Sequence, residues 1–183
     1  MPPAEQSRIT GIEPQQRHPE RVSLFVDGAF VLGVDGAVAV ALGLAVGQSM
    51  DMERLRAVAR AEEGRQAYDR ALYLLGYRAR SRAEVRRRLA QKGYEEEVID
   101  EVLERLAQSG LIDDSQFTEA WVRARTSGRA MGPRRIAWEL RRKGVDAETV
   151  RDAVGRIDAE TELDLALKVG RQKAESVRGE PVQ

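Results

Sequence analysis

The sequence predicts a mainly α-helical protein made of tandem three-helix repeats, preceded by a small N-terminal extension that contains a β-hairpin. Three observations predict this fold class. Apolar residues recur at helical spacing from Asp51 onward, as expected for amphipathic helices with one buried face. β-Branched and apolar residues flank Asp27-Gly28, a dipeptide that suits the positive φ angles of a tight hairpin turn. The chain also matches itself at an offset of 51 residues.

The region before the repeats divides into two predicted parts. Residues 1–21 carry four of the six prolines and the single histidine, His18, so we expect a flexible arm with little fixed structure. Residues 22–66 form the extension, with a hairpin over residues 22–34 and a short helix over residues 37–42. A long helical stretch begins at about Asp51, and Gly64 is the one weak point in it.

The first repeat is predicted over residues 67–114. Ser81-Arg82-Ala83-Glu84 has the form of a capping box, in which the serine caps a backbone N–H and the glutamate reaches back to the helix start. Gly93 ends this short helix and Gly110 ends the next one, because glycine readily takes the left-handed conformation that closes many helices.

The second repeat is predicted over residues 115–158, and its first helix finds side-chain acceptors at Asp113-Asp114-Ser115-Gln116. The internal repeat is inferred from seven pairs of positions 51 residues apart, at which apolar, lysine and glycine residues recur. Val85, Leu89, Lys92, Gly93, Ile99, Leu103 and Leu106 fall on Ile136, Leu140, Lys143, Gly144, Val150, Val154 and Ile157. Such units cannot bury their apolar faces alone and must stack. Residues 159–183 then give a partial third repeat, with room for its first helix only, and a frayed tail.

The composition excludes several classes of protein. Cysteine is absent, which removes disulfides and thiolate sites and fits a reducing compartment, so we expect the cytoplasm. No apolar run approaches the roughly 20 residues that a membrane-spanning helix needs, and the polar N-terminal stretch does not have the form of a signal peptide. Lys plus Arg equals Asp plus Glu at 30 each, so net charge alone predicts no partner.

The balanced total hides strong local charges. Residues 67–94 carry a net charge of +6, residues 95–114 carry −7 and residues 115–158 carry +4. The candidate partner-binding residues are the basic ones of the two repeats: Arg78, Arg80, Arg82, Arg86, Arg87, Arg88, Lys92, Arg123, Arg125, Arg129, Arg134, Arg135, Arg141, Arg142 and Lys143. Arginine suits phosphates and carboxylates alike, since its donors form a fixed fork. The alternative is that each forms a solvated surface or an ion pair with the neighbouring acidic helix, and such pairs are individually weak.

The sequence offers little for catalysis. His18 lacks the second imidazole or the cysteines that a zinc site needs, and we interpret it as a solvated surface histidine. Asp113-Asp114 resembles a carboxylate pair, but at a helix start these residues serve as caps. No glycine-rich run leads into Lys-Ser or Lys-Thr at P-loop spacing. We therefore predict no catalytic, cofactor-binding or metal-binding residue, and no cofactor.

The two tryptophans are candidates for stacking on nucleic acid bases. Trp121 shares an apolar helix face with Phe117, which favours a core position. Trp138 lies between Arg135 and Arg142 and is open to either interpretation.

Several motifs together resemble a known family. They are Arg80-Ser81, Leu89-Ala90-Gln91-Lys92-Gly93-Tyr94, Gly110-Leu111-Ile112-Asp113-Asp114, Phe117, Trp121-Val122, Arg125 and Lys143-Gly144. On these residues the chain from Ala71 to Val154 resembles the RecX family of regulatory proteins, which modulate the RecA recombinase. The segment Glu13 to Gly47, with Arg17, Arg21 and Phe25-Val26-Asp27-Gly28, is similar to the N-terminal extension of some members.

The resemblance implies a curved module that lies in the helical groove of the RecA filament on single-stranded DNA. There it would inhibit ATP hydrolysis and strand exchange, or alter filament growth. The predicted partners are therefore the RecA recombinase filament and the single-stranded DNA within it, with no membrane and no small-molecule ligand. Members usually complete a third three-helix repeat. A chain with only the first helix of that repeat would therefore span less of the groove.

Two other classes of function remain as alternatives. Short three-helix units with a basic helix are also the build of helix-turn-helix proteins, so the chain is alternatively a sequence-tolerant DNA-binding module that acts without recombinase. Few Asn or Gln residues are present on the basic helices to read bases, which disfavours this class. A small hydrolase is the third class, disfavoured by the absence of catalytic groups.

Overall fold

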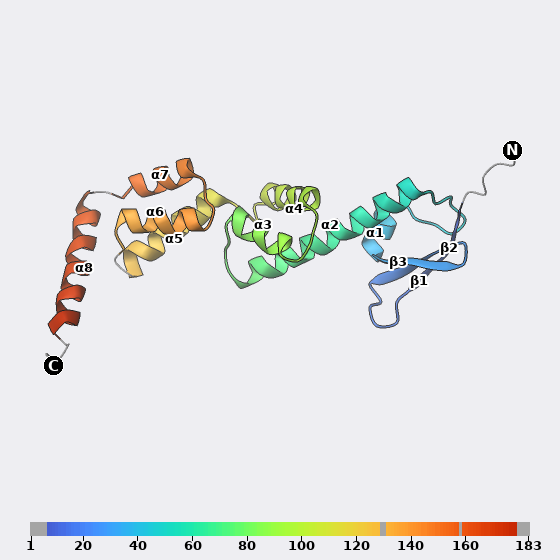
Figure 1. Ribbon diagram of the computed structural model, residues 1–183, viewed down its shortest axis with the longest axis horizontal. Coiled ribbons are helices and arrows are strands. Elements are labelled where there is room, and N and C mark those ends of the chain that lie inside the picture. Colours follow the sequence, from blue (N-terminus) through green and yellow to red (C-terminus); the bar gives the residue numbers. More distant parts are fainter. Residues whose placement is uncertain (1–6, 129–130, 158, 179–183) are drawn as a thin grey trace. The chain divides into compact units, whose positions relative to one another are not determined.

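The computed structural model describes residues 7–128, 131–157 and 159–178, which contain three strands and eight helices (Figure 1). These residues form two compact units. One comprises the chain up to Tyr73 together with Lys92–Val102, and the other comprises Leu74–Gln91 and the chain from Leu103 onward. The fold class predicted from the sequence, mainly helical with tandem three-helix repeats and a small N-terminal sheet, is confirmed.

The N-terminal sheet is antiparallel and has the order β1-β2-β3, with β1 at Ile9–Pro14, β2 at Arg21–Val26 and β3 at Ala29–Asp35. Asp27 and Gly28 form the turn between β2 and β3, with φ angles of 51° and 80°. Two successive positive φ angles are the signature of a type I′ hairpin turn, whose twist matches that of the strands. The predicted hairpin is confirmed at its predicted turn.

The prediction of a flexible arm over residues 1–21 is wrong for residues 7–21. β1 pairs with β2 from Ile9↔Val26 to Pro14↔Val22, and Ile9 is buried. Ile9 lies in the core of the first unit and Ile12 packs against it. This apolar packing orders a segment whose high proline content predicted flexibility. Pro14 ends the strand, where a missing N–H is tolerated. Residues 1–6 lie outside the described part of the chain.

The core of the first unit forms between the sheet and two helices, α1 at Gly36–Ala41 and α2 at Met52–Tyr77. Its buried apolar residues are Ile9, Leu24, Val34, Val38, Met50 and Val58. Glu62 of α2 accepts a 2.6 Å hydrogen bond from the Asp35 backbone N–H and pairs with Arg21 at 2.7 Å. These contacts fix α2 on the sheet. The helix continues through residues 66 and 67, so the predicted boundary between extension and first repeat falls inside it.

The first repeat continues with α3 at Arg82–Ala90 and α4 at Glu96–Gln108. Both bonds of the predicted capping box are present: Glu84 N donates to Ser81 Oγ, and Ser81 N donates to the Glu84 carboxylate. On α4, Val98, Ile99, Val102, Leu103 and Leu106 are all buried, as expected for the apolar face of an amphipathic helix. Gly93 and Gly110, after α3 and α4, both have positive φ, as predicted for their capping roles.

The second repeat consists of α5 at Asp114–Gly128, α6 at Pro133–Arg142 and α7 at Ala147–Gly155, which pack on one another (Figure 1). Phe117, Ile136, Leu140, Val145 and Val150 form its core. The Asp113 carboxylate accepts a 2.9 Å bond from Gln116 N, which confirms the predicted cap for Asp113. The Asp114 carboxylate instead accepts a 2.8 Å bond from Arg82 N at the start of α3. The final helix, α8, occupies Ala159–Arg178.

Candidate macromolecule-binding surface

A buried carboxylate at the start of α3 holds two of the predicted contact residues. Glu84 accepts hydrogen bonds from the Arg78 guanidinium at 2.9 and 3.2 Å and from Lys143 Nζ at 3.0 Å. Burial acts to raise the pKa of Glu84, but the bonds from Arg78 and Lys143 outweigh it and hold that pKa at about 2. The carboxylate therefore stays ionised at neutral pH, and both cations are engaged within the fold.

Beside Glu84, two further contacts join the start of α3 to the backbone that follows α6. Ser81 Oγ donates to the Lys143 carbonyl oxygen at 2.5 Å. Gly144 has a φ of 80°, and a Cβ added there would clash with the Cβ of Ala83. Only glycine therefore permits this close approach between the two repeats.

A second, partly buried ion pair forms where α5 meets α6. Arg125 Nε and Trp121 Nε1 both donate to Glu139 Oε2, at 2.9 and 3.1 Å. The Arg125 bond is the main cause of a lowered pKa at Glu139. Arg125 and Lys143 lie 4.0 and 4.2 Å from the centre of the Trp121 ring. Trp121 is thus half-buried between two cations. It packs against the core of the second repeat, whereas the sequence favoured a position within that core.

The basic residues of the first repeat are dispersed. Arg80 Nε donates to the Leu74 carbonyl oxygen, and partial burial is the main reason that its pKa is lowered. Arg82 lies 3.7 Å from Glu104, and Arg88 donates to Gln91. Arg86 is half-buried, whereas Arg87 and Lys92 are exposed. Few of these side chains are therefore presented to a partner without an internal contact.

In the second repeat, by contrast, exposed arginines surround an exposed tryptophan. Trp138 is 50% exposed, and Arg134, Arg135, Arg141 and Arg142 occupy the positions three and four residues before and after it on α6. Residues at these spacings are neighbours on a helix surface. The guanidinium carbons of Arg142 and Arg135 lie 4.7 and 5.7 Å from the centre of the Trp138 ring. We call these five residues the Trp138 surface.

A hollow of about 450 Å³ adjoins the Trp138 surface. It is lined by Glu84, Trp121, Arg125, Arg135, Trp138, Glu139, Arg142 and Lys143. Both of its carboxylates, Glu84 and Glu139, are already bonded to cations of the protein. The hollow therefore combines aromatic rings with arginines rather than free acidic groups.

The structure thus separates the predicted contact residues into two groups. Arg78, Arg80, Arg125 and Lys143 bond to groups within the fold, although Arg78 is also exposed. The Trp138 surface, Arg87 and Lys92 are exposed. Arg123 is exposed beside Glu119 at 3.8 Å, and Arg129 lies outside the described residues. Sequence reasoning missed Glu84 as a centre of ion pairing, although its place in the capping box was predicted. The spacing of four arginines around Trp138 was the available signal for the surface itself.

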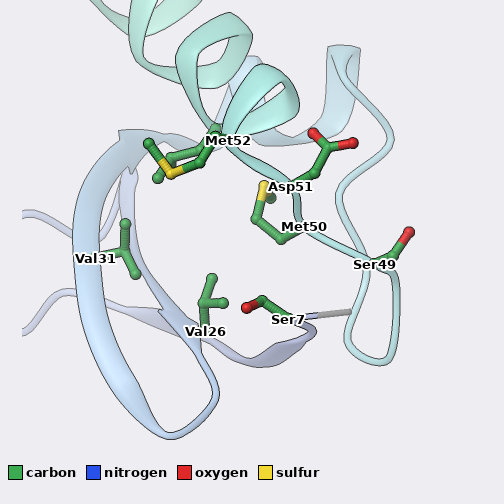
Figure 2. Close-up of a pocket in the computed structure, with 8 residues that line it drawn as sticks. Ser7, Val26, Val31, Ser49, Met50, Asp51 and Met52 are labelled. Atoms are coloured by element: carbon green, nitrogen blue, oxygen red, sulfur yellow. The ribbon is translucent and has the colours of Figure 1, made fainter. Parts of the chain in front are cut away.

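Another hollow, of about 360 Å³, lies in the first unit between the sheet and the start of α2 (Figure 2). Its lining includes Val26, Val31, Met50 and Met52. Asp51, its single carboxylate, caps α2 by accepting a 2.7 Å bond from Arg54 N. Ser7 and Ser49 add polar groups to this lining, and the acidic group of the hollow serves the helix.

Other features of the described residues narrow the kind of site further. Within residues 7–128, 131–157 and 159–178, no group of three or more His, Cys, Asp or Glu residues is placed to hold a metal ion. His18 is exposed beside Glu20, as predicted for a surface histidine. In the same ranges, no helix has the length and apolarity to cross a membrane.

These features define a helical repeat protein with a basic, aromatic surface on its second repeat. The comparisons with known proteins then assign a family. Models of that family match all three regions of the chain: the RecX N-terminal domain at residues 7–51, its first three-helix domain at residues 67–106 and its second at residues 113–154. The chain belongs to the RecX family of regulatory proteins.

Individual relatives agree with this assignment. A "Regulatory protein RecX" from Clostridium perfringens is 31% identical over 91% of this chain and 77% of its own length. One from a Mycobacterium species is 45% identical over 59% of each chain. A crystal structure of regulatory protein RecX aligns over 96% of this chain and 86% of its own, with a TM-score of 0.78 and 27% identity. RecX from Lactobacillus salivarius aligns over 66% of this chain and 79% of its own, with a TM-score of 0.60 and 26% identity.

Proposed function

We propose that this chain binds the filament that the RecA recombinase forms on single-stranded DNA, and that it inhibits ATP hydrolysis and strand exchange by that filament. The observation that supports this proposal is the match of both three-helix domains to a family of regulatory proteins. Its place in the cell would be the cytoplasm, in DNA repair, recombination and the SOS response. No cofactor and no catalytic step of its own are part of this function.

The mechanism that we propose is occupancy of the filament groove. The exposed arginines of α6, with Arg87 and Lys92 of the first repeat, face the filament and contact carboxylates of recombinase subunits or phosphates of the DNA. Each exposed ion pair contributes little, but several sites on one chain add through their effective concentration. Affinity for the filament should therefore fall as the salt concentration rises.

The experiment is a titration of this protein into an ATP hydrolysis assay of the cognate recombinase on single-stranded DNA. Its binding to the same DNA without recombinase is measured in parallel. We expect turnover to fall at protein concentrations too low to coat the DNA.

The opposite result favours the alternative function, a DNA-binding module that acts without recombinase. In that case the protein binds DNA tightly and leaves turnover unchanged until it displaces the recombinase. The exposed Trp138 surface is the feature that keeps this alternative under test, because aromatic rings among arginines suit nucleic acids.

A further inference from the structure

The Trp138 surface combines an exposed ring with exposed positive charge. Half of the surface of Trp138 is accessible even though Arg135 and Arg142 lie over its ring. A tryptophan with no role outside the fold is normally more deeply buried. The indole is therefore placed where a flat ligand can reach it.

The charge of this surface is not neutralised within the fold. Among the ion pairs of the described residues, none involves Arg134, Arg135, Arg141 or Arg142. The nearest carboxylate on the same helix, Glu139, is bonded to Arg125 and to Trp121 Nε1. Across the adjoining hollow, Glu84 is bonded to Arg78 and Lys143. The four guanidinium groups are thus available to an external anion.

We propose that the Trp138 surface is a binding site for single-stranded nucleic acid, in which an unpaired base stacks on the indole and the arginines contact the flanking phosphates. Single strands expose the faces of their bases, and base–aromatic stacking tolerates every sequence. In a duplex the base faces are already stacked, so the ring has nothing to contact. The adjoining hollow of about 450 Å³ lies within the range of small-ligand pockets, about 300–1,000 Å³, and accommodates a base turned out of the strand.

The first repeat provides a natural comparison. At the repeat offset, Trp138 corresponds to Arg87, and Arg134 and Arg135 correspond to Ala83 and Glu84. The first repeat thus has no aromatic residue at this position, so the stacking site belongs to the second repeat alone. Arg87, which is exposed, serves as a control for loss of charge without loss of the ring.

This inference extends beyond the proposed function, since the site binds a single strand whether or not recombinase is present. The probe is a thymidine oligonucleotide of about 16 nucleotides, the upper end of typical single-strand site sizes. An abasic oligonucleotide with the same number of phosphates separates stacking from charge. The proteins are the full chain, Trp138→Ala, Trp138→Phe and Arg87→Ala, each checked for unchanged helix content and thermal unfolding.

We expect Trp138→Ala to weaken binding of the thymidine oligonucleotide at least about fivefold, the lower end of the loss on removing one stacking ring. Trp138→Phe should retain most of the affinity, and Arg87→Ala should weaken the thymidine and abasic probes by the same factor. The abasic probe should bind the full chain and Trp138→Ala equally. In a Trp121→Phe background, where Trp138 is the sole indole, the thymidine probe should quench the tryptophan fluorescence.

Three results overturn the inference: equal binding of the thymidine probe by Trp138→Ala and the full chain, equal affinity of the full chain for thymidine and abasic probes, or an effect of Trp138→Ala only on binding to recombinase without DNA. The last result makes Trp138 a protein contact. ATP hydrolysis by the recombinase is measured separately. If the full chain inhibits turnover and Trp138→Ala binds DNA as tightly as the full chain does, this site is refuted and the proposed function stands. If Trp138→Ala loses DNA binding but the full chain does not inhibit turnover, the proposed function alone is refuted.

Discussion

Lys143 Nζ lies 3.0 Å from Glu84 Oε1, across 59 residues of sequence. The lysine ends the basic helix of the second repeat, whereas the glutamate begins the basic helix of the first. Their side chains are 18% and 8% exposed. A pair so shielded from solvent interacts more strongly than an exposed one, so this contact is a structural joint between the repeats.

Loss of the charge at this joint should destabilise the protein. We expect Glu84→Gln to lower the free energy of unfolding by about 1–3 kcal/mol, because Arg78 and Lys143 lose a charged acceptor. Urea unfolding followed by circular dichroism measures the change. Glu101→Gln is the control, since Glu101 pairs with Arg60 in solvent and should leave the unfolding midpoint unchanged. A Glu84→Gln midpoint equal to that of the original chain would contradict the structural role.

The same carboxylate should make stability depend on pH in acid. The pKa of Glu84 is about 2 in the folded protein, against an ordinary value of 4.5. Between these values the unfolded chain binds a proton that the folded chain does not, so the stability contribution is lost as the pH falls. The difference in unfolding free energy between the original chain and Glu84→Gln should be constant above about pH 4.5. It should shrink toward pH 2, and a difference that stays constant down to pH 2 would show that the pKa is not lowered.

Two equivalent glycines should respond differently to alanine. Gly93 and Gly144 have φ angles of 88° and 80°, but only Gly144 faces a neighbour, Ala83. Gly93→Ala should cost about 1–2 kcal/mol of stability, the strain of a left-handed backbone. Gly144→Ala should cost more, since it adds the clash with Ala83. Chemical unfolding of both variants measures the two costs.

A double mutant isolates the clash. Adding Ala83→Gly to Gly144→Ala removes the obstructing methyl group, so the pair should be more stable than the sum of the two single changes predicts. If the free-energy changes of the two single variants simply add in the double mutant, residues 83 and 144 do not approach each other as closely as in the structure.

Sequence reasoning succeeded where the determinants are local. The turn at Asp27-Gly28 and the capping box of Ser81 and Glu84 each depend on a few consecutive residues. It failed where distant segments decide the outcome. The short apolar segment around Ile9 becomes a strand because β2 lies beside it, and the pairing of Glu84 with Lys143 depends on how the repeats stack. The repeat offset aligned Lys143 with Lys92, but Lys92 is exposed, so one repeated residue has two different roles.

The exposed arginines of α6 should contribute to filament binding without contributing to folding. Arg141→Ala removes a cation that no described ion pair contains, and Arg151→Ala removes another exposed arginine, from α7. We expect Arg141→Ala to raise the protein concentration needed for half-maximal inhibition of recombinase ATP hydrolysis about two- to fivefold, the effect of losing one exposed ion pair. Arg151→Ala should leave that concentration unchanged, and both variants should unfold as the original chain does. Because the Arg141 contact is electrostatic, the gap between the two variants should narrow as salt is added. Equal inhibition by the two variants at low salt would mean that the basic surface of the second repeat does not contact the filament.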